Sequence, residues 1–139
     1  MLDTFKQIEL SRTRFEDVKN ENGKIIDTKI VTDTRNYVLT FNVNVIDQLD
    51  QKYKTEDKNG FQLFLEKLDS QNLDDIWKAS VDFLTMCVNE GIRQENKHRE
   101  DVGLEKLEYL RNDEINITAM NSTSLALEVL SNGMPQQKN

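Results

Sequence analysis

Apolar residues recur at helical spacing most clearly between residues 72 and 91. The members of this stripe, separated mainly by three- and four-residue steps, are Leu73, Ile76, Trp77, Phe83, Leu84, Cys87 and Val88. Asn72 precedes them as an N-cap, because its side chain can accept a hydrogen bond from a first-turn N–H. Gly91 is placed for a left-handed C-cap. The pattern therefore predicts a central helix over residues 72–91, with the rest of the chain packed around it.

The N-terminal third has the composition of β-strands. Asn22-Gly23 is a strong hairpin-turn dipeptide, since a type I′ turn needs positive φ at both central residues. A second turn is expected over residues 32–36. The three strands expected around these turns are residues 13–18, 24–32 and 37–41. The result is an antiparallel meander over residues 12–41, while residues 1–11 receive no assignment.

Two short helices are expected between the meander and the central helix. Asn42 or Asn44 can cap the first, which ends near Tyr53. Asn59 precedes the second, whose apolar residues fit the i, i+3, i+4, i+7 template: Phe61, Phe64, Leu65 and Leu68. Both helices would turn one apolar side toward the central helix.

The C-terminal part gives a weaker helical pattern. Residues 93–101 are strongly charged and predict either a solvated loop or an extension of the central helix. Leu104, Leu107 and Leu110 form one narrow helical stripe. A last helix is expected from near residue 116 to 130, with a break at 121–122 left open, and it stops at Asn132-Gly133.

These elements predict an α+β fold in one domain of 139 residues. Its expected parts are a β meander or hairpin at residues 12–41, a bundle of four to five helices at 42–132, and a flexible tail at 133–139. Lys and Arg number 18 against 25 Asp and Glu, a net charge of −7. That charge repels phosphate backbones and anionic lipids, so proteins are the expected partners, without nucleic acid or membrane.

The sequence offers little that could support catalysis or metal binding. Residues 55–66 resemble a calcium loop, but Thr55 stands where the first carboxylate ligand is needed. Glu95 and His98 have a di-iron spacing, yet that site needs two copies and His98 is the only histidine. The single cysteine, Cys87, excludes an internal disulfide and fits a buried small hydrophobe in a reducing cytosol. No enzyme activity, cofactor or metal is therefore expected.

The order of elements and their apolar pattern resemble a known family. The segments that carry the resemblance are TFNVNVIDQLDQKY, GFQLFLEKLD, LDDIWKASVDFLTMCVNEG and ALEVLSNG, within residues 25–133. Together they look like the tail assembly chaperones of long-tailed phages of low-G+C Gram-positive bacteria. The first 20 or so residues depart from the shorter members of that family.

The resemblance implies a non-enzymatic protein of the host cytoplasm that is absent from the mature virion. It would bind the phage tape-measure protein, keep it soluble and help to recruit tail-tube protein; a homo-oligomer is also allowed. The expected partner-binding residues lie beside the central helix: Trp77, Phe83, Leu84 and Cys87. Burial of the two aromatic residues in the domain's own core is the competing expectation. A structural head–tail joining or tail-terminator protein is the alternative function, and a host regulatory or antitoxin-like domain is a third.

The extreme C-terminus suggests a further property of the gene. Residues 137–139, Gln-Lys-Asn, can be encoded by CAA AAA AAC, which contains a heptamer on which ribosomes slip back by one base. The family resembled commonly makes a longer form by such a programmed frameshift. An A+T-rich gene that simply ends in Lys-Asn is the competing explanation.

Overall fold

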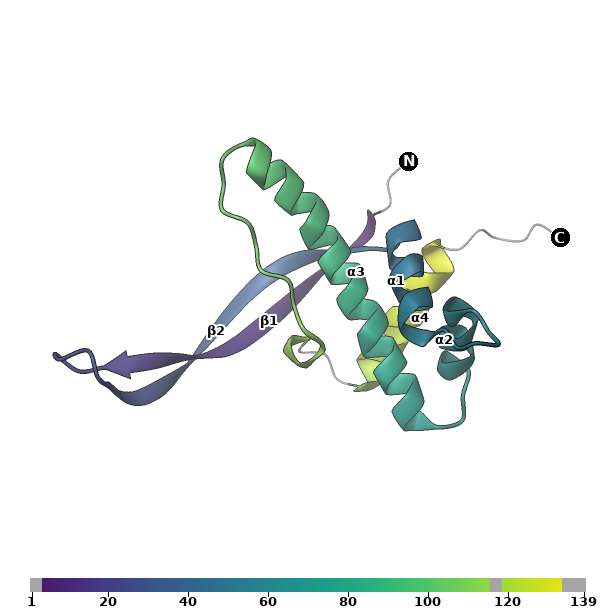
Figure 1. Ribbon diagram of the computed structural model, residues 1–139, viewed down its shortest axis with the longest axis horizontal. Coiled ribbons are helices and arrows are strands. Elements are labelled where there is room, and N and C mark those ends of the chain that lie inside the picture. Colours follow the sequence, from purple (N-terminus) through teal and green to yellow (C-terminus); the bar gives the residue numbers. More distant parts are fainter. Residues whose placement is uncertain (1–3, 116–118, 134–139) are drawn as a thin grey trace.

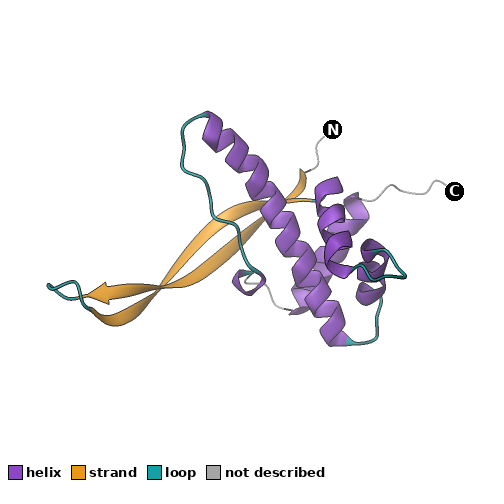
Figure 2. Cartoon of the chain, viewed as in Figure 1, coloured by secondary structure: helices purple, strands orange, loops and turns teal. Residues whose placement is uncertain are grey.

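A long β-hairpin and a group of helices make up residues 4–115 and 119–133, which are the residues that the computed structural model describes (Figure 1). The elements are β1 (Thr4–Lys19), β2 (Ile25–Thr40), α1 (Val43–Tyr53), α2 (Gly60–Leu68), α3 (Leu73–Asp101), the 3₁₀ turn η1 (Asn112–Glu114) and α4 (Ala119–Gly133). Figure 2 shows the strands projecting to one side of the helices. The predicted α+β class, a β-hairpin followed by four helices, is confirmed for the described residues.

The β part is one hairpin, and the third strand expected from the sequence is wrong. β1 and β2 pair antiparallel from Thr4–Thr40 at the base to Lys19–Ile25 at the tip. Residues 32–36, expected to turn, continue β2 because residues 9–13 of β1 lie opposite them. The hydroxyls of Thr13 and Thr32 lie 3.3 Å apart across the strands. Residues 9–11, left unassigned in the sequence analysis, therefore supply much of the partner that keeps β2 extended.

The hairpin tip has a different turn from the one predicted. In the described residues, glycines alone have positive φ, and Gly23 has φ 78°. A type I′ turn is therefore wrong, because Asn22 would also need positive φ. The Asn20 side chain instead accepts hydrogen bonds from the N–H groups of Asn22 at 2.9 Å and Lys24 at 3.0 Å. The position of the hairpin was predicted correctly although its turn geometry was not.

The central helix begins where predicted and runs to Asp101, so the interpretation of residues 93–101 as a helix extension is confirmed and the end predicted at Gly91 is wrong. The Asn72 side chain accepts a hydrogen bond from the Asp75 N–H at 3.2 Å, which confirms the N-cap. Gly91 lies inside α3, so the C-cap expected there is wrong. A Cβ on Gly91 would overlap the Val38 carbonyl oxygen, so this glycine lets the helix approach β2 closely. The terminating glycine is Gly103, at φ 78°.

The helix expected from the stripe Leu104, Leu107 and Leu110 is absent, and that segment is a loop. Two asparagines of α3 hold it. The Asn96 side chain donates to the Leu107 carbonyl at 3.0 Å and accepts from its N–H at 2.7 Å. Asn89 makes the same pair of bonds with Leu110, both at 2.8 Å. These amides satisfy backbone groups that a helix would otherwise satisfy.

The shorter helices agree with the sequence pattern. Asn42 caps α1 through the N–H groups of Asn44 and Val45, and Asn59 caps α2 through that of Gln62. α4 runs without a break through residues 121–122. Its predicted start at residues 116–118 lies outside the described residues. So do residues 134–139, on which most of the flexible tail and the frameshift prediction fall.

Aromatic residues from three helices and from the segment that follows β2 meet at the centre of the molecule. Phe83 of α3 stands edge-on to Phe41, which follows β2, with ring centroids 5.2 Å apart. Phe64 of α2 lies 5.5 Å from Phe83 and 5.8 Å from Tyr53 of α1. α3 contacts β2 and each of the other described helices. The prediction that α3 organises the fold is therefore confirmed for the described part of the chain.

Candidate functional site

Three of the four residues expected to bind a partner lie in the core. Phe83, Leu84 and Cys87 have no exposed surface. Their side of α3 is covered by β2, α1, α2 and α4, so the expectation that they form a binding surface is corrected. The most regular apolar stripe of the sequence is the one that builds the fold. Trp77 differs, because it is half-buried and lines a surface groove.

The groove at Trp77 has a polar floor. It encloses about 530 Å³ and is lined by Lys52, Trp77, Lys78, Val81, Asp82 and Asn112. The buried Asp82 carboxylate accepts hydrogen bonds from Lys52 at 2.9 Å, from Asn112 at 2.5 Å and from the Tyr53 hydroxyl. Burial, followed by the contact with Asp82, raises the pKa of Tyr53. This network ties α1 to α3 and η1, so the floor of the groove serves the fold.

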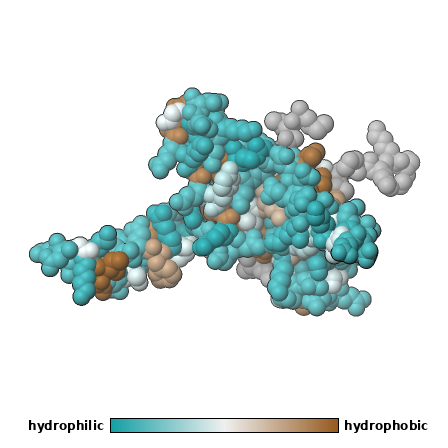
Figure 3. Space-filling view, viewed as in Figure 1, coloured by the Kyte–Doolittle hydropathy of each residue, from teal (hydrophilic) through white to brown (hydrophobic). Residues whose placement is uncertain are grey.

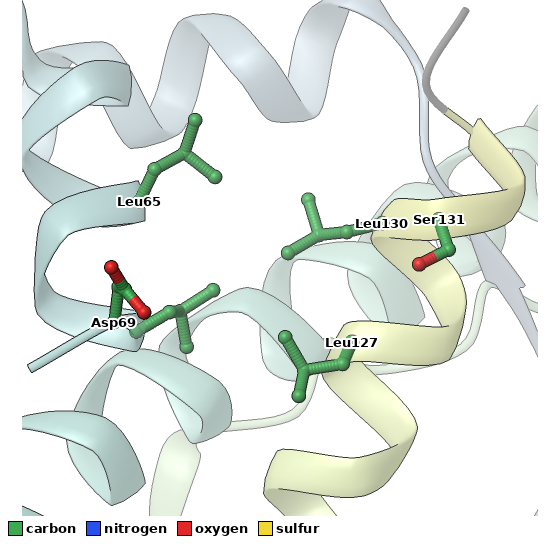
Figure 4. A pocket seen from close by; sticks show the side chains of 6 residues that line it. Leu65, Asp69, Leu127, Leu130 and Ser131 are labelled. Carbon is green, nitrogen blue, oxygen red and sulfur yellow. The ribbon is translucent and has the colours of Figure 1, made fainter. Parts of the chain in front are cut away.

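A second groove lies between α2 and α4 and has four leucines in its walls. We call it the leucine groove; it encloses about 370 Å³ and is lined by Leu65, Leu68, Asp69, Leu127, Leu130 and Ser131. Figure 4 shows leucine side chains of the two helices pointing toward one another across the gap. Leu127 is 48% exposed, whereas its neighbours Ala126, Val129 and Leu130 on the same helix are buried. The groove can therefore receive large apolar side chains from another protein.

Sequence reasoning missed the leucine groove, although a signal for it was present. Leu65 and Leu68 stand at i, i+3 on α2, and Leu127 and Leu130 repeat that spacing on α4. Each pair looks like core pattern when it is read alone. The groove exists because α2 and α4 both pack against α3 and leave part of both leucine pairs uncovered between them. That arrangement depends on tertiary packing, which one helix pattern does not specify.

The described residues offer no constellation for metal chemistry. Within residues 4–115 and 119–133, no group of three or more His, Cys, Asp or Glu side chains could hold a metal ion. In the same part of the chain, no helix is both long and apolar enough to cross a membrane. In the calcium-like loop at residues 55–66, the Lys58 ammonium instead lies 3.4 Å from a carboxylate oxygen of Glu66. Asn59 of the same segment caps α2, so the segment forms the start of that helix.

Cys87 is expected to resist thiol reagents in the folded protein. Its side chain is buried beside Glu90, and burial, followed by the Glu90 charge, raises the pKa of the thiol. The reactive thiolate is therefore scarce at neutral pH, and the reagent cannot reach it. Ellman's reagent should label Cys87 only as fast as the protein unfolds, and should label it fully in urea. Rapid labelling of the native chain would contradict this packing of α3.

Comparisons with protein-family models, with curated proteins and with solved structures gave no match. The resemblance to the phage tail assembly chaperones therefore rests on the sequence pattern alone.

Proposed function

We propose that the protein is a non-enzymatic tail assembly chaperone, which binds the tape-measure protein in the host cytoplasm and helps to recruit tail-tube protein to it. The leucine groove is the observation that carries the proposal. A tape-measure protein is long and helical, and an amphipathic helix can lay its apolar face into a groove between two helices. Client side chains spaced at i and i+3 or i+4 would meet the leucines of α2 and α4 in turn.

Charge supports a client of a particular kind. The chain carries a net charge of −7, and Asp69 lies in the wall of the leucine groove. An apolar stripe flanked by lysine or arginine would place its positive groups beside this acidic surface. Such complementarity speeds encounter and orients the client, while burial of its apolar face gives most of the affinity. The groove therefore fits a basic amphipathic helix.

Replacing Leu127 by aspartate is expected to abolish most client binding. A carboxylate in the groove would lose its hydration as an apolar helix docked, at a cost of about 2 kcal/mol or more, which is about 30-fold in Kd. Pull-down and titration calorimetry with co-expressed tape-measure fragments measure the change. Leu104→Asp is the matched control, since Leu104 is similarly exposed and lies on the loop after α3.

Two results would count against the proposal. Equal loss of binding in both variants would mean that the leucine groove is not the docking site. A tape-measure protein that is equally soluble with and without this chain would remove the chaperone role itself. Mass spectrometry of purified virions separates the alternative: a chaperone should be missing from the particle, whereas a head–tail joining or tail-terminator protein should be present in stoichiometric copies.

A further inference from the structure

The distal hairpin exposes large apolar side chains far from the leucine groove. We call residues 13–34, comprising the outer parts of β1 and β2 and their turn, the arm. Its exposed large apolar residues are Phe15, Ile26, Ile30 and Ile25, which are 71%, 60%, 68% and 53% exposed. Figure 3 shows hydrophobic surface on this projecting part of the molecule. An exposed cluster of this kind indicates a surface that another protein covers.

The arm also lacks the support that two strands normally need. Its base is held by ion pairs of Arg12 with Glu108 at 3.0 Å and of Arg35 with Glu95 at 2.7 Å. Farther out, every residue from 21 to 30 is exposed. A two-stranded hairpin is marginally stable in water, and a third strand or a packed face is usually required. In the described part of the chain no strand lies along the outer edge of β2.

The sequence of that edge is complementary to itself. Residues 25–31 read Ile-Ile-Asp-Thr-Lys-Ile-Val, which has the same pattern in both directions with opposite charges exchanged. If two copies run antiparallel about Thr28, Asp27 of each faces Lys29 of the other. Apolar residues then face apolar residues: Ile26 meets Ile30, and Ile25 meets Val31. The segment also contains no proline or glycine and has a net charge of zero, as pairing edges require.

We propose that residues 25–31 pair antiparallel with the same residues of a second copy of this chain, centred on Thr28, to form a four-stranded sheet. The pairing adds a strand to each arm and extends the cross-strand row in which Phe15 lies opposite Ile30. It is independent of the proposed function, because it uses neither the leucine groove nor any client. The partner is the chain itself.

Charge selects this register over its neighbours. In an antiparallel strand pair related by a two-fold axis, directly opposed residues lie on the same face of the sheet. The axis therefore passes through a residue position, and any other register must be centred on a different residue. A centre at Lys29 opposes lysine to lysine, and a centre at Ile30 opposes Asp27 to Asp33. A centre at Val31 also pairs opposite charges, but it uses Arg35, which already holds Glu95 through two hydrogen bonds.

The fold itself also opposes the register centred on Val31. That register would bring the partner's turn beside Val38, whose carbonyl oxygen is already covered by α3 at Gly91. The register centred on Thr28 ends near residue 32 and keeps both helical parts clear. This separation matters because each chain has a net charge of −7 and the helical parts repel one another, an effect that falls off over about 8 Å at physiological salt. Two neutral segments, residues 25–31 of each arm, can therefore join the acidic helical parts at a distance.

An exchange of charges tests the register. Analytical ultracentrifugation of the full chain should show a concentration-dependent dimer. D27K should weaken it about tenfold, because two opposite-charge pairs become two like-charge pairs. K29D should do the same, and the double variant D27K/K29D should restore the dimer. In the register centred on Val31 the double variant would set two positive side chains, those of residues 27 and 35, opposite each other, so failure to restore association would overturn the proposal.

A cysteine placed on the two-fold axis gives a second readout. T28C should form an intermolecular disulfide under mild oxidation, since opposed Cα atoms in antiparallel strands lie about 4.5–5.5 Å apart. The native Cys87 is buried and does not compete. V31C is the matched control and should cross-link far less. E21K, which changes the charge of the turn as D27K changes that of the strand, should leave the dimer intact. A monomer at all concentrations, or preferential linkage through V31C, would overturn the pairing proposed.

Discussion

Replacing Phe83 by alanine is expected to lower the free energy of unfolding by about 3–5 kcal/mol, the usual cost of removing a large buried aromatic side chain. Phe83 has no exposed surface and contacts Phe41 edge-on and Phe64 at 5.5 Å. Its removal leaves a cavity shared by the hairpin base, α2 and α3, so the walls cannot collapse without moving three elements. Urea unfolding, followed by far-UV circular dichroism, measures the loss.

Two variants show whether this cost comes from burial. Phe15→Ala makes the same chemical change on the exposed arm and should leave the unfolding of the monomer within about 0.5 kcal/mol. Trp77→Ala removes a half-buried side chain, so its cost should lie between these values. The Trp77 variant also tests whether Trp77 binds a partner, since it is the one accessible residue of the four expected to do so. If Phe83→Ala is no more costly than Phe15→Ala, the core described here is wrong.

The sequence predicts the helices well because their signals are local. Asn42, Asn59 and Asn72 each begin a helix, and each accepts a hydrogen bond from an N–H two or three residues later, as capping requires. The stripe that follows Asn72 sets the buried side of α3 without reference to the rest of the fold. The apolar period and the N-cap residue agree in these segments, so a few neighbouring residues specify where each helix starts.

The errors arise where distant residues decide the conformation. Residues 104–110 have a helical spacing, yet Asn89 and Asn96 draw their backbone into a loop from positions on α3 that look like an ordinary polar face. Residues 32–36 have turn-like composition, and residues 9–13 keep them extended. In both places a partner far along the chain satisfies the backbone, and local propensity is overridden.

The candidate site was predicted less well than the fold for a related reason. The strongest apolar stripe of a small domain is needed for its core, so Phe83, Leu84 and Cys87 have no exposed surface with which to bind a partner. The accessible apolar residues belong to weaker patterns: two leucine pairs on α2 and α4, and the isoleucines of the arm. Their exposure follows from how the elements meet. Sequence alone ranks them below the core residues, whereas accessibility in the fold reverses that order.

Replacing Gly91 by alanine is expected to destabilise the protein by about 3 kcal/mol, toward the upper end of the cost of overpacking. Alanine in a helix interior normally stabilises by about 1 kcal/mol relative to glycine, so the expected sign is opposite to that of helix propensity. The reason is steric: a Cβ here would overlap the Val38 carbonyl oxygen and lie 3.3 Å from its carbonyl carbon. Because that obstacle is backbone, α3 or β2 must shift. Thermal and urea unfolding measure the change.

Gly103 provides the control that separates steric need from backbone strain. A Cβ on Gly103 meets nothing within 4 Å, but its φ of 78° lies in the left-handed region. Alanine there should cost about 1–2 kcal/mol, and asparagine, which tolerates this conformation, should recover part of the loss. Asparagine at position 91 should be at least as damaging as alanine, since its larger side chain meets the same carbonyl. If Gly91→Ala instead stabilises the protein, then α3 does not approach β2 as closely as described, and the helix end predicted at residue 91 would have to be reconsidered.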